Sequence, residues 1–312
     1  MLFLNTKNLI YALTVAEERS FSNAAKKLYL SQPSLSQSIS ALEKELGAPI
    51  FDRSTIPLSL TYAGEKFIKA ASEILSIERR LKREIEDILD SKSGRLVIGI
   101  SSLRCTNIIP LAFPIFQKKY PSVELVLEEG SNEKLTEMVL SGKVDLALAN
   151  PINNADLDSI PLILDRVLLA VYHEHPLAQQ TQDKHNLPII DMEKVKDDPF
   201  IIISSEHHVR KIADKIFSDH NITPKVILET SSIELAHRLV AQGMALTMVL
   251  ESMVNYHQPA ASYFRFENEY THSLNICYRK NDYLSKIMLN FIDIAKKVTT
   301  QLDNYKPDPF QY

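Results

Sequence analysis

The first thirty residues repeat apolar side chains at the spacing of amphipathic helices, with polar capping residues between the repeats. Residues 6–18 place Leu9 and Leu13 on one face, which predicts a first helix. Ser20 and Ser22 are both suited to cap a second helix, which is predicted over the sequence SNAAKKLYL. Two short helices in succession are therefore expected at the start of the chain.

A third helix is predicted from about Gln32 to Leu46. Pro33 suits the first turn of a helix, and Gly47 suits the residue just past its end. Two short β-prone pieces, PIFDR and LSLT, then flank a turn near residues 54–57. The predicted order is helix, helix, turn, helix and a two-stranded wing, which is a winged helix-turn-helix.

Residues 62–90 show one long helical pattern whose apolar side chains alternate at spacings of four and three. Six of seven positions on this stripe are apolar: Phe67, Ala71, Ile74, Glu78, Leu81, Ile85 and Ile88. Such a stripe on a charged helix needs a partner, and a second copy of the helix is the simplest one. Packing within its own domain is the alternative. We expect a homodimer.

From residue 93 onward, short apolar strands alternate with helices, and the pattern begins again near residue 163. Repeated strand–helix–strand order implies an α/β fold with a parallel sheet covered on both faces. A cleft between two such halves is suited to a small molecule. The predicted domains are a winged helix-turn-helix (1–61), a linker and dimerisation helix (62–92) and a two-lobed α/β domain (93–312), with lobe I at about 93–162 and 267–312 and lobe II at about 163–266.

Composition favours a soluble globular protein. Of the 312 residues, 45% are hydrophobic and 24% are charged, and no apolar run is long enough to span a membrane. The amphipathic start lacks a basic segment and a cleavage site, so no signal peptide is expected. Two cysteines, Cys105 and Cys277, are too few for a disulfide framework and fit a reducing cytoplasm. We therefore expect a cytoplasmic protein without membrane contact.

Charge is distributed unevenly along the chain. The net charge is −4, but residues 1–70 carry eight basic and six acidic side chains, an excess of +2. This excess permits nucleic-acid binding without demonstrating it.

The N-terminal motif resembles that of the LysR-type transcriptional regulators. The resemblance rests on AEERSFSNAAKKLYLSQPSLSQSISALEKELGAPIFDRS and LSLTYAGE, with further echoes in SGKVDLALA and in HPLA at 175–178. It implies a regulatory domain of the periplasmic-binding-protein type and homodimers that assemble into homotetramers. It also implies binding to promoter inverted repeats and a small-molecule effector between the lobes, which changes DNA bending and contact with RNA polymerase. No cofactor is implied.

Polar side chains on the third helix are the candidate DNA contacts, because Leu35, Ile39 and Leu42 turn inward. Amides and hydroxyls both donate and accept hydrogen bonds, which suits base edges and phosphates. A polar, solvated helix is the alternative for such a stretch alone. The candidates are Ser22, Gln32, Pro33, Ser34, Ser36, Gln37, Ser40 and Arg53, with Lys26 and Lys27 as possible backbone contacts.

One position departs from the pattern of many family members. Gln37 stands where they carry arginine after the second serine of the motif, so arginine readout of guanine from this helix is absent. A glutamine at a base edge favours adenine. Arg53, at the wing, becomes the leading cationic contact.

Hydroxyl and amide groups follow the ends of several predicted strands in both lobes. We expect a polar, anion-tolerant effector cleft, although capping at strand-to-helix turns explains each group equally well. No arginine is fixed in this cleft, since Arg104 and Arg210 are only nearby in sequence. The candidate effector residues are Ser101, Ser102, Asn150, Ser204, Ser205 and Thr230.

Other functions have weaker support. An enzyme is disfavoured because no nucleophile elbow, phosphate-binding loop or metal-ligand set appears. His173, His175, His207 and His208 lack the further ligands that a metal site needs. A ligand-binding protein without DNA activity stays open, as does a redox-responsive regulator that uses Cys105. A helix start beside Cys105 would lower the pKa of its thiol.

Overall fold

The computed structural model describes residues 5–89, 93–152, 154–179, 187–254 and 260–302. The chain forms two compact units: residues 1–91 with 141–143, and residues 92–140 with 144–312. Each unit has its own buried core.

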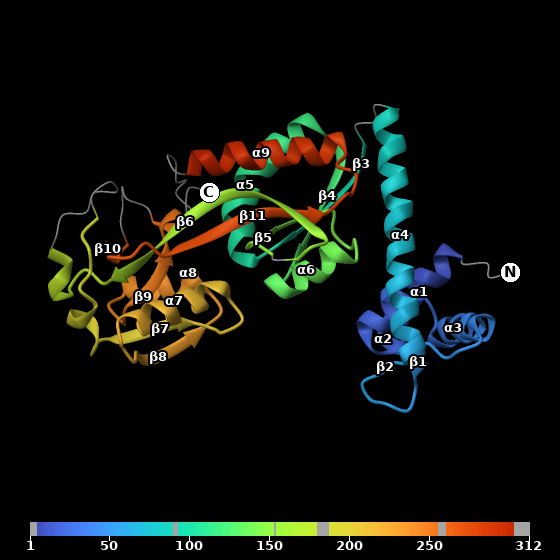
Figure 1. Cartoon of the computed structure of the whole chain (residues 1–312), viewed down its shortest axis with the longest axis horizontal. Coiled ribbons are helices and arrows are strands. Elements are labelled where there is room, and N and C mark those ends of the chain that lie inside the picture. Colours follow the sequence, from blue (N-terminus) through green and yellow to red (C-terminus); the bar gives the residue numbers. More distant parts are fainter. Residues whose placement is uncertain (1–4, 90–92, 153, 180–186, 255–259, 303–312) are drawn as a thin grey trace. The chain divides into compact units, whose positions relative to one another are not determined.

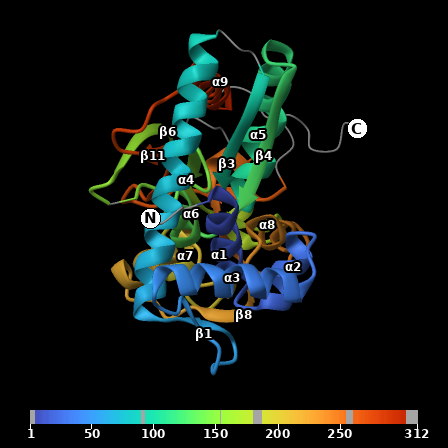
Figure 2. The same cartoon turned by 90° about the vertical axis from the view of Figure 1, so that its right-hand side faces the viewer.

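The first unit is a winged helix-turn-helix followed by a long helix (Figure 1). Its elements are α1 (Thr6–Glu18), α2 (Phe21–Lys27), α3 (Gln32–Leu46), β1 (Phe51–Asp52), β2 (Ser59–Leu60) and α4 (Tyr62–Ile88). The wing strands β1 and β2 pair antiparallel. Both views show α3 and the wing at the same end of α4 (Figures 1 and 2).

Capping groups set the boundaries of the short helices. The hydroxyl of Ser20 accepts the backbone N–H of Asn23, and that of Ser31 accepts the N–H of Ser34, each at 3.3 Å. Gly47 ends α3 with a φ of 77°, in the left-handed region that glycine adopts most readily. Of the two serines that the sequence offers as caps, Ser20 is the N-cap residue of α2 and Ser22 lies inside the helix.

The apolar stripe on α4 divides into two parts. Phe67 and Ala71 are buried in the core of the first unit, together with Leu9, Leu35 and Ile39. Further along α4, large apolar side chains are exposed. They are Ile74, Ile77, Leu81, Ile85 and Ile88, of which Ile88 is 81% exposed. The first turns of α4 therefore complete the core, and the rest presents an apolar face.

The second unit contains a seven-stranded sheet within the described residues, in the order β10-β6-β11-β5-β3-β4, with β9 also paired to β6. The strands are β3 (Ser93–Ile100), β4 (Ser122–Glu129), β5 (Leu146–Ala149), β6 (Leu157–Val171), β9 (Thr247–Leu250), β10 (Ser262–Phe264) and β11 (Thr271–Arg279). Strands β3, β4 and β5 are parallel, whereas β6 and β11 are antiparallel to their neighbours. The expected parallel sheet is thus a mixed one.

Helices cover this sheet, and a smaller sheet completes the unit. The helices are α5 (Ser102–Lys119), α6 (Asn132–Leu140), α7 (His208–Asp219), α8 (Ile233–Ala241) and α9 (Lys286–Leu302). Strands β7 (Pro199–Ile203) and β8 (Lys225–Thr230) form a parallel pair. Short 3-10 turns lie at Pro176–Gln179, Met192–Val195 and Glu251–Met253.

The long strand β6 extends through both halves of this unit. Its first half pairs with β11, and its second half pairs with β9 and β10. From the sequence, the second run of strands is expected from about residue 163, but β6 already begins at Leu157. Pro161 lies in β6 opposite Asn275, next to an irregularity of the β11 register, which is where a strand tolerates proline.

Candidate nucleic-acid interface and sensor site

The first turns of α3 present a row of polar side chains to solvent. Leu35, Ile39 and Leu42 are buried, so the helix has one inner face. The exposed predicted residues are Ser22, Gln32, Pro33, Ser34, Gln37, Ser40 and Arg53, and Ser36 is half-buried. Gln32 and Gln37 make no side-chain hydrogen bond within the described residues, so their amides can donate and accept elsewhere.

Arg53 is held against α3 instead of extending freely from the wing. Its Nη2 lies 3.0 Å from Ser40 Oγ and 3.0 Å from Glu43 Oε2. Its guanidinium also lies over the ring of Phe21, 5.0 Å from the centroid. The sequence pointed to Arg53 as a cation, but it did not reveal Glu43, whose carboxylate lies ten residues away along the chain.

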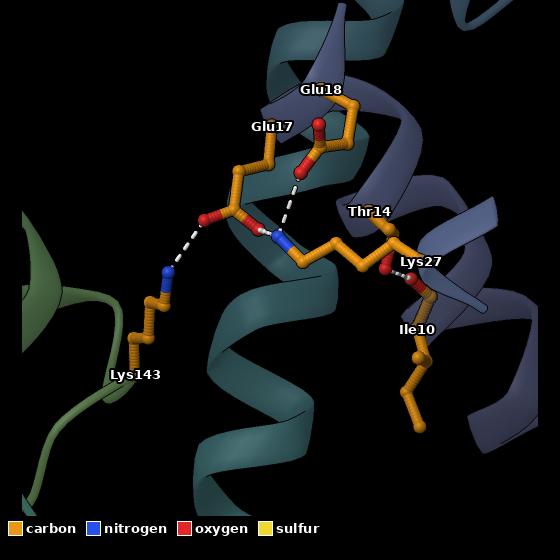
Figure 3. A network of polar contacts seen from close by, with 6 residues as sticks. All are labelled: Ile10, Thr14, Glu17, Glu18, Lys27 and Lys143. Atoms are coloured by element: carbon orange, nitrogen blue, oxygen red, sulfur yellow. Dashed lines mark hydrogen bonds and ion pairs between the residues drawn. The ribbon is translucent and has the colours of Figure 1, made fainter. Parts of the chain in front are cut away.

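The two lysines of α2 differ in their surroundings. Lys27 Nζ pairs with Glu17 Oε2 at 2.9 Å and with Glu18 Oε1 at 2.7 Å (Figure 3). The hydrogen bonds that Lys27 donates to Glu18 and Glu17 raise the pKa of Lys27. Glu17 also contacts Lys143, from the segment 141–143 that belongs to the same unit. Lys27 is therefore engaged in ion pairs, whereas Lys26 has no ion pair among the described residues.

Strand ends in the second unit carry the predicted sensor residues. The backbone N–H of Ser204 donates to Thr230 O at 2.9 Å, so these two strand ends are adjacent. Ser204 Oγ is shielded from solvent and has no hydrogen-bond partner within the described residues. Thr230 Oγ1 accepts the N–H of Ser232, so this hydroxyl serves the turn, and Ser205 is exposed.

The other half contributes its own strand ends. The N–H of Asn150 donates to Asn132 Oδ1 at 2.9 Å, which joins the end of β5 to the start of α6. Ser101 is the N-cap residue of α5 but makes no side-chain capping bond. The side chains of Ser102 and Arg104 lie outside the described residues. Arg210 pairs with Asp214 at 2.8 Å and with Glu229 at 3.6 Å.

Two charged residues at the starts of α6 and α7, Glu133 and Lys211, were not singled out from the sequence. The pKa of Glu133 is lowered by its own backbone N–H and by Ser131, and more weakly by Lys211 of α7. The ring of His208 lies 5.4 Å from that of buried His272. Burial and Lys211 lower the pKa of His208. The charge of Lys211 therefore acts on both Glu133 and His208.

The family follows from comparison with known proteins. The family model described as "Bacterial regulatory helix-turn-helix protein, lysR family" matches residues 6–65. The model described as "LysR substrate binding domain" matches residues 89–300. The chain is a LysR-type transcriptional regulator. The two matches cover the winged helix-turn-helix and nearly the whole second unit.

Relatives agree with this assignment. The regulator is 30% identical over 310 residues to the HTH-type transcriptional regulator YcgK of Bacillus subtilis, with 96% of each chain covered. It is also 30% identical to a Synechocystis protein named "Probable RuBisCO transcriptional regulator", covering 94% of this chain and 86% of the other. A solved full-length OxyR from Pseudomonas aeruginosa has a TM-score of 0.69 at 22% identity, covering 95% and 97% of the two chains. That likeness concerns the fold.

The cysteines of the regulator are poorly suited to thiol sensing. Burial, with Glu129 nearby, raises the pKa of Cys105, so the expected lowering by a helix start is wrong. Burial raises the pKa of Cys277 to about 11. Cys105 packs against one core of the sheet and Cys277 lies in another. The two thiols are therefore not positioned to form a disulfide with each other.

The histidines have structural partners. His175 Nδ1 accepts the N–H of Leu177, and its Nε2 lies 3.2 Å from Asp198 Oδ2. Across the described ranges, no three histidine, cysteine or acidic side chains come together as a metal site would require. In the same part of the chain, none of the helices is sufficiently long and apolar to cross a membrane.

Proposed function

We propose that this LysR-type regulator reads DNA through the exposed residues of α3 and its wing, and that a small anionic metabolite between the lobes controls it. The observation that carries the DNA half is the polar row on α3, whose amides make no bond within the described residues. The N-terminus of α3 also offers backbone N–H groups to a phosphate. Gln37 is the leading contact to a base, with adenine preferred.

The DNA half is tested by footprinting with purified full-length protein on the region upstream of its own gene. We expect protection of an inverted repeat, and Gln37→Ala should weaken that protection. The matched amide control is Gln117→Ala, which changes a glutamine of α5. Absence of any protected region by the unchanged protein would contradict the proposal.

The proposed effector site uses Ser101, Ser102, Asn150, Ser204, Ser205 and Thr230, at strand ends of both lobes. The unpartnered Oγ of Ser204 supports it, because a buried hydroxyl without a hydrogen bond costs about 1–3 kcal/mol that an incoming acceptor would recover. The first turn of α7, which follows this strand end in the chain, carries the ionisable His208 and the cationic Lys211. An anion is therefore the favoured ligand class.

A thermal-shift screen with small carboxylates and phosphate esters tests the effector site. A ligand that raises the unfolding temperature should lose most of its effect in Ser204→Ala. Ser218→Ala, at an exposed position of α7, is the matched control and should keep the full shift. Equal shifts in both variants would remove Ser204 from the site.

We further propose that the exposed face of α4 pairs with a second copy, and that the dimers assemble into tetramers in the cytoplasm on promoter inverted repeats, where RNA polymerase is contacted. Two weakly charged DNA-binding units bound at once would give the affinity that each lacks alone.

A redox-responsive regulator that uses Cys105 is the alternative, and the raised pKa of that thiol weighs against it. Retained ligand binding without any DNA binding would favour the other alternative, a ligand-binding protein.

A further inference from the structure

Glu43 joins the wing to α3. Its Oε1 accepts the backbone N–H groups of Ile50 at 2.9 Å and Phe51 at 3.1 Å, where the chain enters β1. Its Oε2 accepts from Arg53 Nη2 at 3.0 Å. The side chain of Glu43 is only 14% exposed. One carboxylate thus fixes both the start of the wing strand and the arginine at its end.

The guanidinium of Arg53 is held from three sides. Nη2 donates to Glu43 and to Ser40 of α3, and the central carbon of the guanidinium lies over the ring of Phe21 of α2. The Phe21 ring in turn meets Phe51 of β1 edge-on, with centroids 5.7 Å apart. Nε and Nη1 of Arg53 have no partner within the described residues, and the side chain is 44% exposed. One edge of the guanidinium is anchored while the other is available.

A carboxylate in this position has an electrostatic disadvantage. DNA affinity rises with every positive charge that replaces a counterion at a phosphate, and Glu43 offsets the charge of Arg53. A neutral glutamine could accept the same two backbone N–H groups. Only a carboxylate also makes a charge-assisted bond to the guanidinium, and such bonds are stronger and more directional than neutral ones. Holding Arg53 in one orientation is what the negative charge adds.

We infer that Glu43 is a positioning residue for DNA recognition. Its negative charge lowers the attraction of this unit to DNA phosphates in general. Its hydrogen bonds fix the orientation of Arg53 and the position of the wing relative to Gln37 and the rest of α3. Its effect is to increase the discrimination between the target sequence and other DNA. This inference rests on the proposed DNA binding through α3 and the wing.

The experiment measures affinity for two duplexes across a range of salt concentrations, with the full-length protein. One duplex is the sequence that the unchanged protein enriches from random DNA, and the other is a scrambled duplex of equal length and composition. The specificity ratio is the affinity for the enriched duplex divided by the affinity for the scrambled duplex. In Glu43→Gln, affinity for the scrambled duplex should rise about threefold and the specificity ratio should fall about tenfold. The slope of log affinity against log salt should steepen by up to about 0.9, the value of one added phosphate contact.

Two further variants separate positioning from charge. Glu45→Gln removes the same charge from an exposed position of α3, so both affinities should rise together and the ratio should stay within about twofold of the original. Arg53→Lys keeps the charge but lacks the planar fork, so the ratio should fall about tenfold with the salt slope unchanged. In Arg53→Lys, Glu43 keeps its hydrogen bonds to the backbone N–H groups of Ile50 and Phe51. This variant therefore tests whether a fixed guanidinium at residue 53 contributes to specificity, even if Glu43→Gln fails to fold.

An unchanged ratio in Arg53→Lys would overturn the inference, as would an equal fall of the ratio in Glu45→Gln and Glu43→Gln. Both results leave DNA binding by the unchanged protein intact. Failure of the unchanged protein to enrich any duplex is a separate result, and it would overturn the proposed function from which the inference starts.

Discussion

Gly64, in the first turn of α4, lies directly against the backbone carbonyl of Ile50. A Cβ built on Gly64 would stand 1.9 Å from Ile50 O and 2.8 Å from its carbonyl carbon. Thr61 tightens the same junction, since its hydroxyl caps α4 at Gly64 N, 2.9 Å away, and donates to Pro49 O. The long helix and the wing can meet this closely only because residue 64 has no side chain.

Gly64→Ala should therefore destabilise the first unit, by about 3 kcal/mol or more, because backbone atoms and not a flexible side chain must move. Chemical denaturation followed by circular dichroism measures the loss. Gly47→Ala is the comparison, because nothing lies within 4 Å of its Cβ and only the positive φ is unfavourable. It should cost about 1 kcal/mol. Equal losses in the two variants would contradict the role of the close approach.

Gln37→Arg should restore a cationic contact on α3. We expect tighter binding, a salt dependence steeper by about 0.9 and a shift of base preference from adenine toward guanine at one position of each half-site. Selection from random-sequence duplexes, before and after the change, measures the preference. An unaltered preference together with an unaltered salt slope would show that residue 37 does not face DNA.

Ile85→Asp should separate the proposed dimer without unfolding the first unit, because Ile85 is 47% exposed and lies outside the buried core. Sedimentation at micromolar concentration should then show a monomer. DNA binding should weaken by about a hundredfold, as expected when one DNA-binding unit acts alone. Lys82→Asp, on the same helix with a 77% exposed side chain, should leave the association state unchanged. A dimer that persists in Ile85→Asp would exclude this face of α4 from the interface.

Cys105 should react slowly with iodoacetamide at pH 7, because only the thiolate is nucleophilic and the pKa of this thiol is raised. The reaction rate should keep rising as the pH increases past 9, because the ordinary pKa of a cysteine thiol is 9.0 and that of Cys105 is higher. Cys277→Ser isolates the thiol of Cys105 for this measurement. Rapid labelling at pH 7, above the rate of a free cysteine, would support the redox alternative.

Local features of the first unit could be predicted from the sequence, because they depend on neighbouring residues. Ser31, Pro33 and Gly47 set the ends of α3 through capping and backbone preference alone. The burial of Leu35 and Ile39 follows from helical spacing. The role of Ser22 could not be decided, because Ser20 competes for the same cap and only the backbone shows which serine is used.

Features that depend on distant residues were not predictable. The link between Glu43 and Arg53 requires the wing to fold back on α3, and no local pattern specifies that. The sequence pattern places the second run of strands from about residue 163, whereas β6 begins at Leu157 and includes Pro161, opposite Asn275 and beside an irregularity of the β11 register. In the second unit, the strand-end positions could be predicted from the sequence, but the effect of the Lys211 charge on the pKa of Glu133 depends on the three-dimensional arrangement.

Strands β6 and β11 run through the second unit without a break at any boundary between lobes. β6 pairs with β11 along one part of its length and with β9 and β10 along the other. A hybrid sensor made by exchanging one lobe would have to splice the middle of two paired strands, where a shift of one residue turns every side chain to the opposite face. The part of this regulator that can be transplanted is therefore the whole two-lobed domain, and the proposed effector site at its strand ends is where a change of ligand specificity would be sought.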